Sequence, residues 1–150
     1  MDLNLISNWN KLITMNDDVI HLGDFGNPDT ISLLNFKTMY FLSGNYERND
    51  KSIVERLKKD DRVVILDGVN NKVKINGKEY YLCHEPLNDM GKDKFYLYGH
   101  IHRLQSVKRN GINVGIDANR FRPVSTSEIE FLRGGIDKYF DENVFTEYCF

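Results

Sequence analysis

A chain of 150 residues with 41% hydrophobic and 12% aromatic content is long and apolar enough to form one packed domain. The net charge is −2 with acids and bases interspersed, which excludes recruitment of nucleic acid or anionic membrane by bulk charge. No apolar run approaches the ~20 residues of a membrane span, and residues 1–10 do not resemble a signal peptide. Two cysteines, Cys83 and Cys149, are too few for a disulfide framework. We therefore expect a single cytoplasmic domain over residues 1–150 with reduced thiols.

The first half of the chain alternates helical and strand patterns. Apolar residues at helical spacing predict an amphipathic helix over residues 2–14. Asn27 as a cap with Pro28 at the first helical position predicts a helix at 27–37, and Asp50 caps another at 49–60. Strands are expected at 18–24, 38–44 and 62–68. These three helix-then-strand units are typical of an α/β sheet.

The second half has a different pattern. Asn76-Gly77 and Asn110-Gly111 each predict a hairpin turn, because a type I′ turn needs positive φ at both central residues. "FYLYGH" (95–100) is a further strand, and "STSE" (125–128) has the spacing of a capping box that begins a short helix. The prediction is a mixed, layered α/β domain whose second half is largely antiparallel.

Polar residues follow four of the predicted strands: Asp24, Asn45, His84 and His100. Ligands of open α/β sheets bind outside the carboxyl ends of strands, so these side chains are expected to converge. In an extended segment His102 would share a face with His100. A carboxylate, an amide and imidazoles suit Mn²⁺, Fe²⁺, Ni²⁺ or Zn²⁺ rather than Ca²⁺. The pattern predicts a site for a divalent transition metal.

The alternative is that these histidines are ordinary structural residues, since a lone histidine near a strand end is usually one that is hydrogen-bonded. Three of the four histidines nevertheless fall at these positions, beside Asp24 and Asn45, and this coincidence favours ligation. By strand alternation His21 faces away from Asp24, and Cys83 faces away from His84. Both are predicted to pack in the interior.

Four motifs, "HLGDFG", "LSGNYER", "LCHEPL" and "LYGHIH", resemble four of the five motifs of the calcineurin-like metallophosphoesterases, in the same order. The stretch "NVGIDANRFRPVS" resembles the tail of small bacterial and phage members. This resemblance implies a layered α-β-β-α sandwich with mixed sheets. It also implies a hydrolase that cleaves phosphomonoesters or phosphodiesters with a metal-activated water.

The resemblance also implies roles for the individual residues. Asp24 would bridge two metals, of which one is completed by residues corresponding to Asn45, His84 and His100. The other metal would use His102 together with an aspartate and a histidine from a D-x-H motif, which this sequence does not contain. We therefore expect one well-formed metal site and a second, incomplete one. We also expect a sheet without its first strand, and either an altered sheet centre or a homo-oligomer.

Tyr46 stands where the family has a histidine that assists the leaving group. A phenol can donate a hydrogen bond but supplies no cationic charge, so we expect weakened general-acid catalysis by Tyr46. The alternative is that Tyr46 only packs over the site. Asn45 and Arg48 are the predicted contacts to a phosphate-ester substrate; a solvated surface arginine is the alternative for Arg48.

The sequence leaves two classes of function open. The retained ligands favour a metal-dependent phosphoesterase. The absence of D-x-H favours a catalytically impaired metal-binding or scaffold module, or a truncated gene product. A nucleic-acid-binding module is a distant third, because the chain has neither a basic stripe nor stacking aromatics at recognisable spacing.

Overall fold

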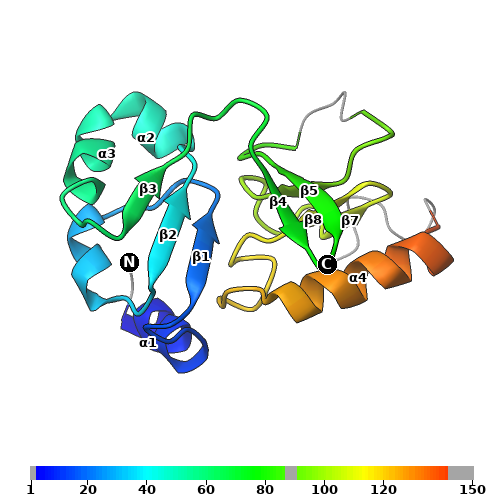
Figure 1. Ribbon diagram of the computed structural model, residues 1–150, viewed down its shortest axis with the longest axis horizontal. Coiled ribbons are helices and arrows are strands. Elements are labelled where there is room, and N and C mark those ends of the chain that lie inside the picture. Colours follow the sequence, from blue (N-terminus) through cyan, green and yellow to red (C-terminus); the bar gives the residue numbers. More distant parts are fainter. Residues whose placement is uncertain (1–2, 87–90, 142–150) are drawn as a thin grey trace. The chain divides into compact units, whose positions relative to one another are not determined.

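The computed structural model describes residues 3–86 and 91–141 and has the predicted mixed α/β class, with two sheets and flanking helices (Figure 1). The chain divides into two compact units, Met1–Val69 and Asn70–Phe150, and each is described here by itself. The single domain over residues 1–150 stays a prediction, as does the homo-oligomer.

The sheet of the first unit consists of three parallel strands in the order β1-β2-β3. The strands are β1 (Asp18–His21), β2 (Thr38–Phe41) and β3 (Val63–Ile65). Helix α1 (Leu3–Leu12) precedes β1, and a helical segment precedes each of the other two strands. The predicted sequence of three helix-then-strand units is therefore confirmed.

Two predicted helices of this unit differ from expectation. Asn27 caps the backbone N–H of Asp29 as predicted, but the segment forms a short 3₁₀ helix, η1 (Pro28–Leu33). The helix expected at 49–60 is two helices, α2 (Asn45–Asn49) and α3 (Lys51–Leu57). The chain turns between them because Asp50 is extended, with φ −133°, and its side chain caps the N–H of Ser52.

The core of the first unit lies around β2. Met39 and Phe41 point into it from the strand and are fully buried. Side chains from the helical segments and the loop before β2 pack around them: Trp9, Ile31, Leu34, Phe36 and Leu57. This core supports the two loops that leave the carboxyl ends of β1 and β2.

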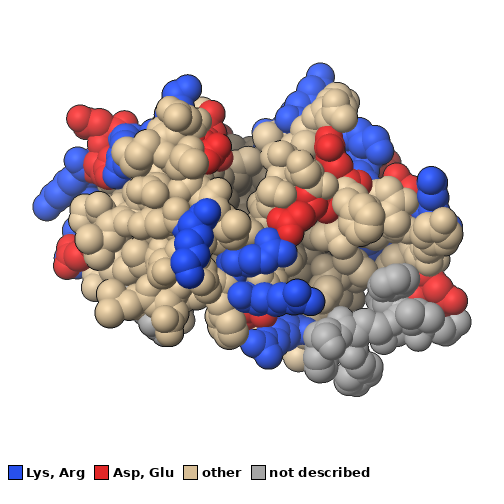
Figure 2. Space-filling model, turned by 90° about the horizontal axis from the view of Figure 1, so that it is seen from below, with Lys and Arg blue, Asp and Glu red and all other residues tan. Residues whose placement is uncertain are grey.

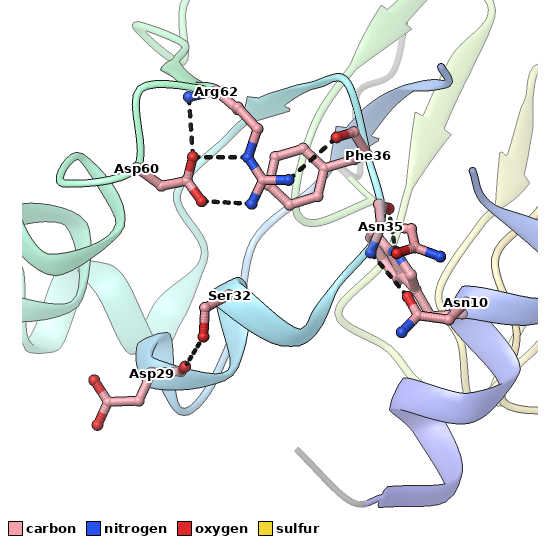
Figure 3. A network of polar contacts seen from close by, with 8 residues as sticks. Asn10, Asp29, Ser32, Asn35, Phe36, Asp60 and Arg62 are labelled. Carbon is pink, nitrogen blue, oxygen red and sulfur yellow. Dashed lines mark hydrogen bonds and ion pairs between the residues drawn. The ribbon is translucent and has the colours of Figure 1, made fainter. Parts of the chain in front are cut away.

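Polar contacts fasten the segment before β2 to its neighbours (Figure 3). The Asn10 side chain of α1 accepts from the Asn35 N–H at 2.8 Å and donates to the Leu33 carbonyl at 2.8 Å. The Arg62 guanidinium stacks 3.9 Å above the Phe36 ring and donates to both carboxylate oxygens of Asp60. Because this paired guanidinium favours the ionised carboxylate, it lowers the pKa of Asp60.

The second unit is built on a five-stranded sheet with the order β4-β5-β6-β8-β7. Its strands are β4 (Lys72–Ile75), β5 (Lys78–Leu82), β6 (Tyr96–Tyr98), β7 (Val107–Lys108) and β8 (Gly111–Asn113). β4–β5 and β7–β8 pair antiparallel as expected, but β5–β6 and β6–β8 pair in parallel, so this half is mixed rather than largely antiparallel. The physical reason is that the long segment between β5 and β6 is a crossover connection rather than a hairpin.

The two predicted hairpins have different outcomes. Asn76 and Gly77 have φ of 48° and 79°, which confirms the turn between β4 and β5. In the second hairpin Lys108 pairs with Gly111, so the turn residues are Arg109 and Asn110 rather than Asn110 and Gly111. Gly111 belongs to β8, where a Cβ atom would lie 2.9 Å from Cε1 of Tyr98. Glycine is needed there because the Tyr98 ring occupies that space.

Helix α4 (Thr126–Tyr139) belongs to the second unit and is longer than the short helix expected. Its capping box is confirmed, because Ser125 Oγ accepts from the Glu128 N–H and the Glu128 carboxylate accepts from the Ser125 N–H. Arg133 joins the helix to the sheet: its guanidinium lies 4.8 Å from the Tyr80 ring centre and 4.5 Å from that of Phe95. Figure 1 shows α4 alongside this sheet.

The capping box makes the stability of the second unit dependent on pH. Arg122 and the Ser125 N–H favour the ionised Glu128 carboxylate and lower its pKa to about 2. Because the pKa is lower in the folded state, this stabilisation is complete above the unfolded pKa of about 4.5 and is lost as pH falls toward 2. We expect Glu128→Gln to reduce the loss of thermal stability between pH 5 and pH 2. Melting curves of both proteins at several pH values measure it, and parallel curves would contradict the prediction.

Among the described residues, neither the surface charge nor the helices point to a membrane-spanning protein or to a surface of one charge sign. Figure 2 shows both basic and acidic side chains on the face that it presents. Within residues 3–86 and 91–141, no helix is both long and apolar enough to cross a membrane.

Candidate functional site

In the first unit, Asp24 lies in the loop after β1 with its carboxylate held by the next loop. The backbone N–H of Tyr46, in the first turn of α2, donates to Asp24 Oδ1 at 3.0 Å. Asp24 has φ of 57°, and Gly23 before it has φ of 99°. The chain therefore turns sharply after the strand, which brings the predicted ligand Asp24 close to the turn that contains Asn45.

A buried carboxylate clamps these two loops together. Glu47 is 2% exposed, and its Oε2 accepts from the N–H groups of Asp24 and Gly44 at 2.9 and 2.7 Å. Its Oε1 accepts from the Phe25 N–H at 2.8 Å. Since both oxygens act as acceptors, the three donors compensate the burial of the negative charge. Glu47 therefore fixes the backbone of the Asp24 loop against the loop before α2.

The three predicted site residues of α2 have different surroundings. Asn45 is the first residue of the helix, and its side-chain oxygen accepts from Nη2 of Arg48. Arg48 also donates from Nε to the Gly44 carbonyl at 3.2 Å. Arg48 thus occupies the amide oxygen that is predicted to bind a metal, and its positive charge would oppose a cation there unless the side chain moved away. The Tyr46 side chain is 55% exposed, and its role as a general acid stays a prediction.

In the second unit, His84 and His100 meet directly. His84 follows β5, His100 follows β6, and His84 Nε2 lies 3.2 Å from His100 Nδ1. Two nitrogens about 2.0–2.1 Å from one ion, at angles of about 90–110°, would be separated by roughly 2.8–3.4 Å. The observed distance therefore fits two ligands of one divalent metal. Without an ion, the same distance fits a hydrogen bond between the rings.

The prediction that His102 shares a face with His100 was wrong, and His102 instead contacts a carboxylate. His100 and His102 have φ of 67° and 52°, so this segment is a turn and not an extended strand in which alternate residues share a face. His102 Nδ1 instead contacts a carboxylate oxygen of Asp117. The reason is that β6 ends at Tyr98 and the chain then turns at His100 and His102 rather than continuing as a strand.

Left-handed backbone marks the predicted ligands in both units. Among the described residues, seven non-glycine residues have positive φ, and three of these are Asp24, His100 and His102. Such conformations are strained for residues with a Cβ atom, and they concentrate where a side chain must be aimed at a ligand. This distribution supports a functional role for the three residues.

His21 and Cys83 make the packing contacts predicted for them, although both are half-buried rather than fully interior. The His21 ring contacts the rings of Phe25 and Phe41, with ring centres 5.2 and 5.1 Å away, and its Nδ1 accepts from the Gly23 N–H. Cys83 Sγ donates to the Leu97 carbonyl, and burial raises the pKa of its thiol to about 11. Cys83 is therefore a poor nucleophile at neutral pH. Cys149 lies outside the described residues.

Three contributors escaped the sequence prediction: Glu47, Asn113 and Asp117. Glu47 could not be found from local spacing, because its burial depends on contacts with the loop of Asp24, more than twenty residues away in the sequence. Asp117 follows β8 as Asp24 follows β1, so the strand-end rule, applied once more, would have found it.

Comparison with known proteins places the chain in a family. The family model of the calcineurin-like phosphoesterase superfamily domain matches residues 2–122, and the chain belongs to this family. An uncharacterised protein of Methanocaldococcus jannaschii, MJ1445, is 26% identical over 141 residues, which cover 83% of this chain and 70% of the relative. A crystal structure of AQ665, a protein of unknown function from Aquifex aeolicus, has a TM-score of 0.61 at 20% identity. That likeness covers 87% of this chain and 83% of AQ665, and it supports the α/β fold.

Proposed function

We propose that this protein is a metal-dependent phosphoesterase that hydrolyses phosphomonoesters or phosphodiesters. The observation that carries the proposal is the pair of imidazole nitrogens of His84 and His100, 3.2 Å apart at the ends of two adjacent strands. Neutral imidazole suits Mn²⁺, Fe²⁺, Ni²⁺ and Zn²⁺. Membership of the calcineurin-like phosphoesterase family supports the same class of chemistry.

We propose that Asp24, Asn45, His84 and His100 are ligands of a divalent metal, which membership of the family supports. Within the second unit, the two histidine nitrogens already lie 3.2 Å apart. The Tyr46 N–H orients the Asp24 carboxylate, which reduces the conformational entropy that this ligand loses on binding. The Asn45 amide oxygen accepts from Arg48, so Arg48 would have to release it before a metal could bind.

The remaining proposed residues act on the substrate. A bound divalent cation supplies Lewis acidity, which neutralises phosphate oxygens and lowers the pKa of a nearby water. Arg48, with Asn45, would orient the phosphate through guanidinium and amide hydrogen bonds. Tyr46, with its exposed side chain, would donate a hydrogen bond to the leaving oxygen. His102 would be a ligand of a second, weaker metal position.

The test is Mn²⁺-dependent hydrolysis of p-nitrophenyl phosphate and of bis-p-nitrophenyl phosphate, which separates monoester from diester cleavage. We expect Asp24→Asn and His84→Ala each to lower the rate by more than about 100-fold, because direct ligands contribute more than the 10–100-fold typical of outer partners. Asp137→Asn, an exposed position on α4, is the matched control and should retain the wild-type rate.

A rate that is equal in the wild type and both ligand variants would contradict the proposal. So would the absence of metal-dependent turnover with Mn²⁺, Fe²⁺, Ni²⁺ and Zn²⁺. Zinc binding without turnover would favour the alternative, a metal-binding module that has lost catalysis. The presence of Tyr46 where the family has a histidine favours this alternative, because a phenol is the weaker general acid.

A further inference from the structure

We propose that Asp117 is a positioning residue that holds the His102 ring in the tautomer and orientation needed to bind a metal through Nε2. The inference deepens the proposed function and rests on it for the presence of a metal position at His102. It concerns contacts that lie entirely within the second unit.

The first argument is the contact between the two side chains. His102 Nδ1 and a carboxylate oxygen of Asp117 are hydrogen-bonded. An ionised carboxylate only accepts hydrogen bonds, so Nδ1 must carry the proton. In neutral imidazole the lone pair is then on Nε2, which is the atom left to bind a cation. Histidine ligands commonly donate their other ring N–H to a carboxylate in this way.

The second argument is that packing does not orient this ring. The His102 side chain is 77% exposed, whereas that of Asp117 is 34% exposed. An exposed imidazole on a turn can rotate about both side-chain torsions unless a specific contact restrains it. The hydrogen bond to Asp117 is such a contact.

The third argument is that two asparagine amide groups, one of them buried, hold both loops in place. Asn113, 2% exposed at the end of β8, donates from Nδ2 to the carbonyls of His102 and Gln105 at 2.8 and 2.9 Å. The Asn119 amide donates to the carbonyls of Asn113 and Gly115 at 2.9 and 2.8 Å.

A direct contact also links the loop of His102 to the loop of Asp117. Arg103 Nε donates to the backbone carbonyl of Asp117 at 3.0 Å. A turn that only connected two strands would not require this set of contacts. The two loops are therefore fixed relative to each other, as a positioning carboxylate requires.

The tautomer can be measured directly by long-range ¹H–¹⁵N correlation spectra of the full chain without metal. We expect the neutral His102 ring to carry its proton on Nδ1 in the wild type, and to become a mixture of tautomers in Asp117→Asn. Asp137→Asn should behave as the wild type. A wild-type ring protonated on Nε2 would overturn the inference, even if the Asp117 variant failed to fold.

Zinc titration followed on the same ring nitrogens gives the second measurement. We expect His102 Nε2 to respond to Zn²⁺ in the wild type, and Asp117→Asn to need about 10–100-fold more zinc for that response. The zinc response of His84 and His100 should stay unchanged, and Asp117→Glu should restore part of the His102 response. No zinc response at His102 in the wild type, or equal responses in wild type and Asp117→Asn, would overturn the inference.

These measurements need no substrate, so they are separate from the test of phosphoesterase activity. An inactive protein with the expected tautomer and zinc response would contradict the proposed function and support the role of Asp117. An active enzyme whose His102 tautomer does not change in Asp117→Asn would support the proposed function and contradict the role of Asp117.

Discussion

Glu47→Gln is expected to destabilise the first unit by about 3 kcal/mol, because a hydrogen bond to a buried charge contributes about 1.5–3 kcal/mol. The carboxylate accepts from three backbone N–H groups through both oxygens. A glutamine has one oxygen, so its NH₂ group must face at least one N–H donor. The substitution preserves side-chain volume, and the loss therefore reports on hydrogen bonding rather than on a cavity.

Chemical denaturation of the full chain measures this change, and hydrogen exchange locates it. The amide protons of Asp24, Phe25 and Gly44 should exchange faster in Glu47→Gln than in the wild type. Glu55→Gln is the control, since Glu55 is exposed on α3 and pairs only at the surface with Lys58. It should change stability by less than about 0.5 kcal/mol. Equal stability of the two variants would show that Glu47 does not clamp the loops.

Gly111→Ala is expected to destabilise the second unit by about 2 kcal/mol, within the 1–3 kcal/mol typical of overpacking. The added Cβ would lie 2.9 Å from Cε1 of Tyr98 and 3.3 Å from the Tyr96 carbonyl oxygen. The Tyr98 ring is fully buried, so it cannot move away without displacing other core side chains.

A glycine-to-alanine substitution on α4 should instead stabilise the protein. At Gly134 a Cβ would meet no atom within 4 Å, and alanine is the better helix former by about 0.8–1.0 kcal/mol. Thermal melts of Gly111→Ala, Gly134→Ala and the wild type compare the two effects. A melting temperature for Gly111→Ala at or above that of the wild type would contradict the packing argument.

The local elements were predictable because their signals are local. Asn76-Gly77, the Asp50 cap and the Ser125 capping box each act over four residues or fewer, and all three are confirmed. Asn110-Gly111 was wrongly predicted as the turn pair, because Gly111 is required for space beside the Tyr98 ring and not for the turn. The parallel pairing of β5 with β6 also depends on contacts far apart in the sequence.

The sequence by itself determined the α/β class, the calcineurin-like phosphoesterase family and the candidate ligands, because strand-end residues and motif spacing are properties of the order of residues. Only the tertiary structure revealed that Glu47 clamps the Asp24 loop, that His84 and His100 meet at 3.2 Å, and that Asp117 contacts His102. The physical reason is that each of these contacts joins residues of different loops, whose approach depends on strand pairing and core packing. Residue type and spacing predict which groups can bind a metal, whereas the fold decides which partner holds each group.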